Sequence, residues 1–192
     1  MSLIVAIKDK NRFLVGCDTR ATQGSHYTDG YSLTKKARMV DKSKGLIVAG
    51  AGTSAICDFA ELILKKHNVE KLDREYILEK FWPELYQRCY KYSSMNNGEI
   101  EGEVMILMKD TGYYIDSCGG VMEIIDNCSI GSGAMIAEAV LHTLSYKDSY
   151  SNYAKIVYCI ESAGAVRNDI SQESYIGSSD GGEFNKYHLT QK

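Results

Sequence analysis

Apolar residues occur in short runs separated by polar turns along the first quarter of the chain. The runs 3–7 and 13–17 are joined by the polar segment KDKNR, and this pattern predicts a β-hairpin. A second apolar pair, 38–41 and 46–51, surrounds the turn DKSKG. Residues 22–34 are polar with two glycines, which predicts a loop.

Two segments that follow predict helices. Residues 55–68 place apolar side chains three and four positions apart, which is the spacing of an amphipathic helix. A tight glycine turn, AGAGTSA, leads into them. Residues 73–92 have a helical pattern as well, with Asp73 as the expected N-cap. Because Pro83 removes one backbone hydrogen bond, we expect it to kink or split this helix.

The second half of the chain repeats the order of strands followed by helices. NNGEIEG predicts a loop, and residues 103–124 predict a strand, an Asp-Thr-Gly turn, a second strand and a further short strand. A second glycine turn, CSIGSGA, precedes helices expected at 135–145 and 150–169, and the tail GEFNKYHLT predicts a last strand. Runs of strands and runs of helices favour a layered fold, with two antiparallel sheets inside and helices outside.

Length and charge limit the class of protein. The 192 residues, 44% of them apolar, fit one domain over residues 1–192 with a sizeable core. The net charge of −3 leaves no basic excess for phosphates, which argues against a nucleic-acid partner. No apolar run approaches the about 18 residues that cross a bilayer, and the start of the chain lacks the features of a signal peptide. We therefore expect a cytoplasmic protein without membrane contact.

The cysteine and histidine positions argue against a metal site. The six cysteines include no Cys-x-x-Cys pair, and the four histidines lie far apart in the sequence. Because no zinc-ligand spacing is present, we expect neither a metal nor a cofactor. Free cysteines behave as small apolar side chains, so buried thiols in a reducing compartment are the simplest interpretation.

The first residues carry the most specific candidate chemistry. If Met1 is removed, Ser2 has a hydroxyl and an α-amine on one residue, and an α-amine with a pKa of about 8 can act as a base near neutral pH. This is the arrangement of an N-terminal nucleophile. A nearby cation and a carboxylate would activate it, and Lys35, Lys36 and Asp18 lie at strand ends.

Each of these signals also has an ordinary structural interpretation. An Asp at a strand end is commonly a turn residue, and a Lys-Lys pair is commonly a solvated surface. Glycine turns such as AGAG and GSG leave backbone N–H groups free for an oxyanion, but glycine turns before helices are commonly just turns and caps. Taken singly, they indicate only a layered α/β protein.

The motifs together resemble a known family. SLIVAIKDKNRFLVGCDTRAT is similar to the start of a mature proteasome β subunit and of the bacterial peptidase HslV. The likeness continues through a Lys-Lys before the third strand, VAGAG before the first helix and IGSG before the third helix. The resemblance implies an N-terminal nucleophile (Ntn) hydrolase of the α+β class, a four-layer αββα sandwich with two antiparallel sheets between helical layers.

The resemblance also implies roles for individual residues. Ser2 corresponds to the nucleophile, where the proteasome family usually has threonine. Asp18 corresponds to the acid that orients the lysine, and Lys36 to the lysine that lowers the pKa of the nucleophile, with Lys35 as the alternative. Gly50 corresponds to the glycine whose N–H supplies the oxyanion hole.

Two further positions complete the site that the resemblance implies. Ser132 corresponds to the serine near the α-amine, and Asp169 to the second acidic position, with Asn168 as the alternative. The strand edges that hold an extended peptide through main-chain bonds correspond to five positions: Ala21, Thr22, Val48, Gly50 and Gly52.

The implied function is an endopeptidase that hydrolyses peptide bonds of peptides or unfolded proteins through Ser2. The alternatives are a catalytically inactive ring scaffold and a small-molecule amidohydrolase on the same fold. The family implies a homo-oligomeric ring and an AAA+ ATPase as a partner. The aromatic-rich helix at 74–92 offers candidate interface residues, although core packing is the commoner use of such a helix.

Overall fold

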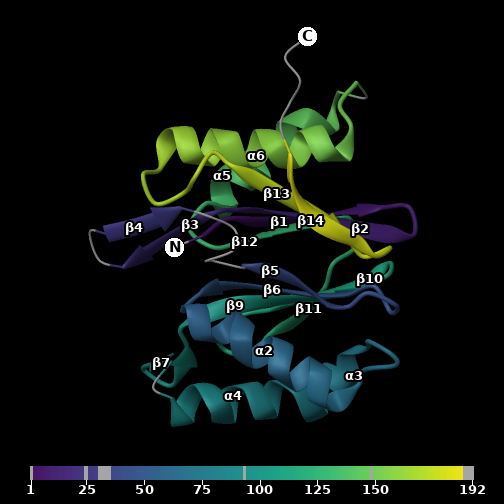
Figure 1. The fold of residues 1–192 in the computed structure, drawn as a ribbon, viewed down its shortest axis with the longest axis vertical. Coiled ribbons are helices and arrows are strands. Elements are labelled where there is room, and N and C mark those ends of the chain that lie inside the picture. The colour runs from purple at the N-terminus through teal and green to yellow at the C-terminus, as the bar shows by residue number, and fades with distance from the viewer. Residues whose placement is uncertain (1, 24–25, 30–35, 93, 148, 188–192) are drawn as a thin grey trace.

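Four layers stack along the long axis of the molecule in the computed structural model, which describes residues 2–23, 26–29, 36–92, 94–147 and 149–187 (Figure 1). Helices form the two outer layers and β-sheets the two inner ones. This is the αββα arrangement that the order of elements and the resemblance both predict.

The first sheet contains both strands of the predicted N-terminal hairpin. Ile4 pairs with Cys17 across the hairpin, and neighbouring strands of this sheet are antiparallel throughout. In sheet order its members are β12 (Asn127–Ile130), β1 (Ile4–Asp9), β2 (Arg12–Asp18), β13 (Ser174–Ser178) and β14 (Gly182–Tyr187). The hairpin ends with Asp18 N–H donating to Leu3 O at 3.1 Å, which fixes Asp18 beside the first residues.

The second sheet is also antiparallel and has five strands. In sheet order these are β11 (Val121–Glu123), β10 (Thr111–Ile115), β9 (Gly102–Met108), β6 (Leu46–Gly52) and β5 (Ala37–Asp41). The central strand β9 pairs with β6 over its full length, from Gly102 opposite Gly52 to Met108 opposite Leu46.

Helices cover the outer face of each sheet (Figure 1). The first sheet is covered by α5 (Ala134–Ser145) and α6 (Asn152–Val166). The second is covered by α2 (Ser54–His67) and by a continuous helical stretch made of α3 (Arg74–Tyr76), η1 (Ile77–Phe81) and α4 (Trp82–Lys91).

Three apolar layers hold these elements together, and strand alternation decides which side chain joins which layer. On β1, Ile4 and Ala6 face the other sheet, while Leu3, Val5 and Ile7 pack toward α5 and α6. A strand buried on both faces must be apolar at every position. This explains why the chain opens on a continuous apolar run.

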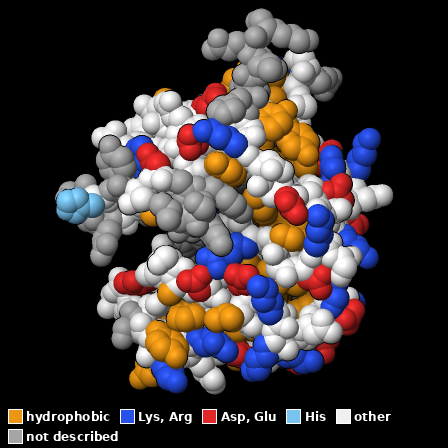
Figure 2. Space-filling view, in the orientation of Figure 1, with side chains coloured by type: hydrophobic (Ala, Val, Ile, Leu, Met, Phe, Trp, Pro, Cys, Tyr) orange, Lys and Arg blue, Asp and Glu red, His pale blue; other side chains and the backbone are white. Residues whose placement is uncertain are grey.

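Charged side chains of both signs are interspersed on the surface shown in Figure 2. Several pair across elements, as Lys44 does with Glu70 at 2.7 Å and Lys66 with Glu84 at 3.0 Å. No helix in the described part of the chain is both long enough and apolar enough to span a bilayer.

The segment predicted as a loop at 22–34 contains regular structure. Strands β3 (Arg20–Gln23) and β4 (His26–Asp29) form a two-stranded hairpin that projects from the first sheet. The sequence did not predict this hairpin because RATQ and HYTD are mostly polar and lack a regular alternation of apolar and polar residues. Within that segment, residues 24–25 and 30–34 lie outside the described residues.

Short strands account for most other differences from the predicted elements. The predicted loop at NNGEIEG holds part of a small hairpin, β7 (Met95–Asn96) with β8 (Glu99–Ile100). Strands β12 and β13 were not expected, because four or five residues give too little alternation to recognise. The last predicted strand is present as β14 up to Tyr187, and its expected continuation lies outside the described residues.

The helix predicted at 73–92 changes type just before Pro83. Trp82 N–H bonds to Ile77 O, which makes η1 a wider π-helical turn, and α4 then begins with the proline in its first turn. Proline is tolerated there because the first N–H groups of a helix have no intrahelical partner. The expected interruption therefore takes the form of a π turn.

The expected N-cap at Asp73 is confirmed, since its Oδ1 accepts the Tyr76 N–H at 2.8 Å. We expect Asp73→Ala to lower the free energy of unfolding by about 1 kcal/mol, measured by urea denaturation, because the first turn loses its acceptor. Asp73→Asn keeps a hydrogen-bond acceptor, so its loss of unfolding free energy should be only a few tenths of the loss in Asp73→Ala. An equal loss in both variants would assign the effect to the ion pair with Lys71 instead.

Candidate active site

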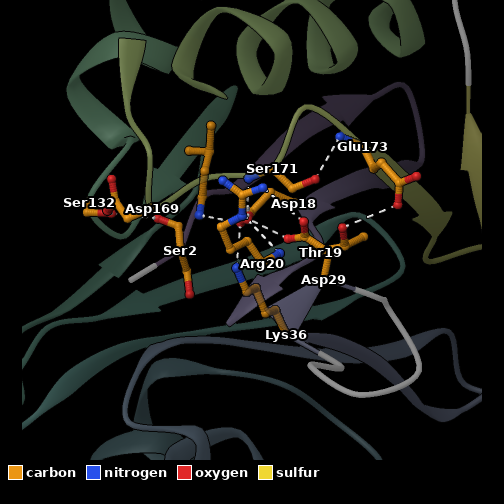
Figure 3. A network of polar contacts seen from close by, with 11 residues as sticks. Ser2, Asp18, Thr19, Arg20, Asp29, Lys36, Ser132, Asp169, Ser171 and Glu173 are labelled. Atoms are coloured by element: carbon orange, nitrogen blue, oxygen red, sulfur yellow. Dashed lines mark hydrogen bonds and ion pairs between the residues drawn. The ribbon is translucent and has the colours of Figure 1, made fainter. Parts of the chain in front are cut away.

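Asp18 is the centre of a buried polar network at the end of β2 (Figure 3). It is completely buried. Its Oδ1 accepts the backbone N–H of Leu3 at 2.8 Å. Its Oδ2 accepts the N–H groups of Arg20 at 3.0 Å and Ser171 at 3.2 Å. The carboxylate thus ties the first strand to the segments after β2 and after α6.

Lys36 forms a buried ion pair with Asp18. Its Nζ lies 2.6 Å from Asp18 Oδ1, and the lysine side chain is only 6% exposed. Lys36 immediately precedes β5, and its backbone oxygen accepts the N–H of Gly50 on β6, whereas its side chain reaches Asp18 of the first sheet. Lys35, the alternative from the sequence, lies outside the described residues.

Ser2 is held by the turn at 131–133, which follows β12. Gly133 N–H donates to Ser2 O at 3.4 Å, and Ser132 Oγ lies 3.4 Å from the same oxygen. Ser132 Oγ also donates to Asp169 Oδ2 at 2.8 Å. Ser132 and Asp169 were each predicted to belong to the site, and the structure brings them together next to Ser2.

Asp169 is placed by the end of α6. The helix was predicted to run to residue 169, but it ends at Val166. The residues after it are free to turn back, and Arg167 binds Asp169 with Nε to Oδ1 at 2.9 Å. Burial acts to raise the pKa of Asp169, but hydrogen bonds from Arg167 and Ser132 outweigh it and hold that pKa below its ordinary value.

Arg20 belongs to the site although the sequence reasoning gave it no role. Its guanidinium binds Asp29 in a bidentate pair, with both distances 2.8 Å, and donates to the backbone oxygen of Asn168 at 2.7 Å. Arg20 thus fastens the β3–β4 hairpin to the segment that carries Asp169. The sequence feature that could have indicated a role for Arg20 is its position two residues after Asp18, within the motif CDTRAT. Asn168 contributes this backbone oxygen, and the carboxylate at the site comes from Asp169.

A cleft of about 950 Å³ opens over this network. Its walls come from the β3–β4 hairpin, the end of β6 and the start of β9, and Ser2, Lys36 and Ser132 lie along it. Cys57 also lines it, but burial raises the pKa of this thiol to about 12. Because a thiol with this pKa stays protonated near neutral pH, Cys57 does not present a thiolate to the cleft.

Comparison with known proteins identifies the family. The family described as "Proteasome subunit" matches residues 2–168, most of the chain. The chain belongs to this family. Among curated proteins, no sequence matches it.

Solved structures with this proteasome-family fold include two of BPH from Thiobacillus denitrificans. One is BPH alone, with 14% identity, a TM-score of 0.73 and coverage of 92% of this chain and 96% of that one. The other is BPH in complex with epoxomicin, with 14% identity, a TM-score of 0.71 and coverage of 92% and 97%. Eukaryotic HslV from Trypanosoma brucei has 13% identity, a TM-score of 0.65 and coverage of 92% and 98%.

Gly50 and Val48 do not have the arrangement in this proteasome-family chain that their expected roles require. The N–H of Gly50 already donates to Lys36 O at 2.8 Å, so it is not a free oxyanion donor in this structure. Val48 does not line the cleft. Its side chain is buried under α2 and its backbone lies between β5 and β9, which leaves no edge for a peptide. The other expected peptide-binding positions line the cleft: Ala21, Thr22, Gly50 and Gly52.

The lowered pKa of Asp169 predicts a pH-dependent contribution to stability. The unfolded carboxyl titrates near pH 4, and the folded one titrates lower. The contribution is therefore present above pH 4 and is lost as the pH falls through the folded pKa. We expect wild type to lose more unfolding free energy than Asp169→Asn between pH 5 and pH 2.5, measured by urea denaturation.

The matched control for this measurement is Asp110→Asn, because Asp110 is an exposed turn residue away from the network. It should leave the pH dependence of the wild type unchanged. Identical pH profiles for wild type and Asp169→Asn would contradict the prediction.

Proposed function

We propose that this chain is an endopeptidase of the proteasome and HslV type, acting through Ser2 after Met1 has been removed. The observation that carries the proposal is the buried pair of Lys36 and Asp18, anchored to the backbone of Leu3 directly beside the nucleophile. A buried lysine charge is costly unless it is paired. Its position in the cleft with Ser2 suits a cation that stabilises a developing alkoxide.

The proposed reaction has two halves. The α-amine of Ser2, directly or through a water, takes the hydroxyl proton as Oγ attacks the peptide carbonyl carbon. The C–N bond then breaks, the protonated α-amine returns the proton to the leaving amine, and an acyl ester remains on Oγ. Water attacks the ester in the second half, so the carboxylic acid product leaves and Ser2 regains its proton.

The oxyanion requires donors at the cleft. Lys36 supplies a positive charge there, and the Gly50 N–H contributes only if the carbonyl of the substrate replaces Lys36 O as its acceptor. Peptide recognition is proposed along the cleft walls at Ala21, Thr22 and Gly52, where main-chain bonds would hold an extended segment.

We further propose a homo-oligomeric ring in the cytoplasm, assisted by an AAA+ ATPase. Family membership supports the ring, and the buried free cysteines, among them Cys17, Cys57 and Cys89, suit a reducing compartment. Size-exclusion chromatography with light scattering tests the ring, and a monomer would count against it.

The chemical state of residue 2 tests the proposed function. The intact mass of protein from its native host should be lower than the full chain by one methionine. A peptide epoxyketone, which needs both a hydroxyl and a free α-amine on one residue, should then add once, at Ser2. Retained methionine without labelling would favour an inactive scaffold. Turnover of simple amides without any peptide cleavage would favour an amidohydrolase.

A further inference from the structure

The turn at 131–133, here called the Ser2 clamp, approaches the nucleophile through its backbone. Gly131 has a φ of +93°, and a Cβ placed on it would lie 2.3 Å from Ser2 O and 3.2 Å from the Cβ of Ala51. Only glycine fits such a position. The backbone of the clamp therefore lies close against both Ser2 and strand β6.

One side of the Ser2 clamp is held from the end of α6. Ser132 Oγ donates to Asp169, which Arg167 in turn fixes by two contacts at 2.9 and 3.1 Å. These residues belong with the first sheet and its helices. They restrain the middle of the turn but not its beginning.

The other side of the Ser2 clamp is held by Glu103 on β9, across the gap between the sheets. Glu103 Oε2 accepts the N–H of Gly131 at 3.0 Å. Glu103 Oε1 accepts the hydroxyl of Tyr114, on the neighbouring strand β10, at 2.8 Å. Burial, with the hydrogen bond to Glu103, raises the pKa of Tyr114, so the phenol keeps the proton that it donates.

We propose that Glu103 is a positioning residue for the reaction at Ser2. It fixes the second sheet, through Tyr114 and the Gly131 N–H, to the turn that holds the Ser2 carbonyl. The proposal rests on the proposed endopeptidase function, because it assigns Glu103 a part in that reaction. Glu103 lines the cleft, but each of its oxygens already has a donor, so it acts by holding the turn.

General magnitudes for hydrogen bonds and for misplaced reacting groups indicate how much rate the loss of the Glu103 contact should cost. A hydrogen bond to a charged carboxylate is stronger than one between neutral groups, and a displacement of about 1 Å at a reacting group can cost about 10²-fold in rate. Loss of the Glu103 contact would leave the Gly131 N–H without its acceptor and the clamp restrained from one side.

Steady-state kinetics with an unstructured fluorogenic peptide tests the proposal. We expect Glu103→Ala to lower kcat by about 10²-fold, with KM within about threefold of wild type, because substrate contacts remain. Glu103→Gln keeps an oxygen acceptor for Gly131 and should recover most of the loss. The matched control is Glu123→Ala, since Glu123 is an exposed glutamate on β11 of the same sheet and does not line the cleft; it should retain wild-type kcat.

Amide hydrogen exchange gives a readout that does not need activity. The amides of residues 131–133 should exchange faster in Glu103→Ala than in wild type, and at wild-type rates in Glu123→Ala. Unchanged exchange, or equal kcat losses in Glu123→Ala and Glu103→Ala, would overturn the proposal. If wild-type protein that has lost Met1 neither cleaves peptide nor reacts with the epoxyketone, the proposed function is wrong. The exchange measurement would then still test whether Glu103 holds the turn at 131–133.

Discussion

Ser2→Ala is expected to lower kcat/KM for an unstructured peptide by about 10⁴-fold or more, because it removes the only protein atom that forms a covalent bond to the substrate in the proposed mechanism. Covalent uptake of a peptide epoxyketone should disappear together with turnover. The measurement is fluorogenic peptide hydrolysis followed by intact mass spectrometry of the labelled protein.

The cleft offers a close control for this substitution. Ser54 is another serine on the cleft wall, at the start of α2, and its side chain is exposed. Ser54→Ala should keep both turnover and labelling. Undiminished turnover in Ser2→Ala would exclude Ser2 as the nucleophile, and equal losses in the two variants would point to damage to the cleft as a whole.

Lys36→Met is expected to abolish activity and to destabilise the protein at the same time. It leaves the carboxylate of Asp18 fully buried without its cation, and breaking a buried pair from one side costs about 3–5 kcal/mol. Three backbone N–H groups still bind Asp18, which favours the lower end of that range. Urea denaturation measures the stability, and peptide hydrolysis measures the activity.

A double variant separates the two effects of Lys36. Lys36→Met with Asp18→Asn removes both charges, so part of the lost stability should return, whereas activity should not. Lys42→Met is the surface control, because Lys42 is 64% exposed and pairs with exposed Glu183; it should cost less than about 1 kcal/mol. Recovery of activity in the double variant would show that Lys36 has only a structural part.

Local sequence patterns were sufficient to predict the N-terminal hairpin, and with it the place of Asp18. Continuous apolar runs flanked by a polar turn define that hairpin, and its register then sets Asp18 against Leu3. The helices were predictable for the same reason, since their apolar spacing is local.

The parts of the site that the sequence did not reveal depend on contacts between distant segments. Glu103 meets Gly131 across 28 residues, and no local pattern distinguishes it from Glu101. The sequences of β3 and β4, RATQ and HYTD, show no regular alternation of apolar and polar residues, so no local pattern predicts this hairpin. The resemblance placed Ser132 and Asp169 in the site, but it indicated neither their hydrogen bond nor Arg167, whose role appears only because α6 ends at Val166.

The near-complete burial of Ser2, at 5% exposure, has a practical consequence for handling the protein. An affinity tag or fusion partner placed ahead of Ser2 would acylate its amine, at a residue that lines the cleft proposed for the substrate. The other end of the described chain is better suited, because β14 is an edge strand whose last residue, Tyr187, reaches the surface. Purification by a carboxyl-terminal tag would keep the amine of Ser2 available to react.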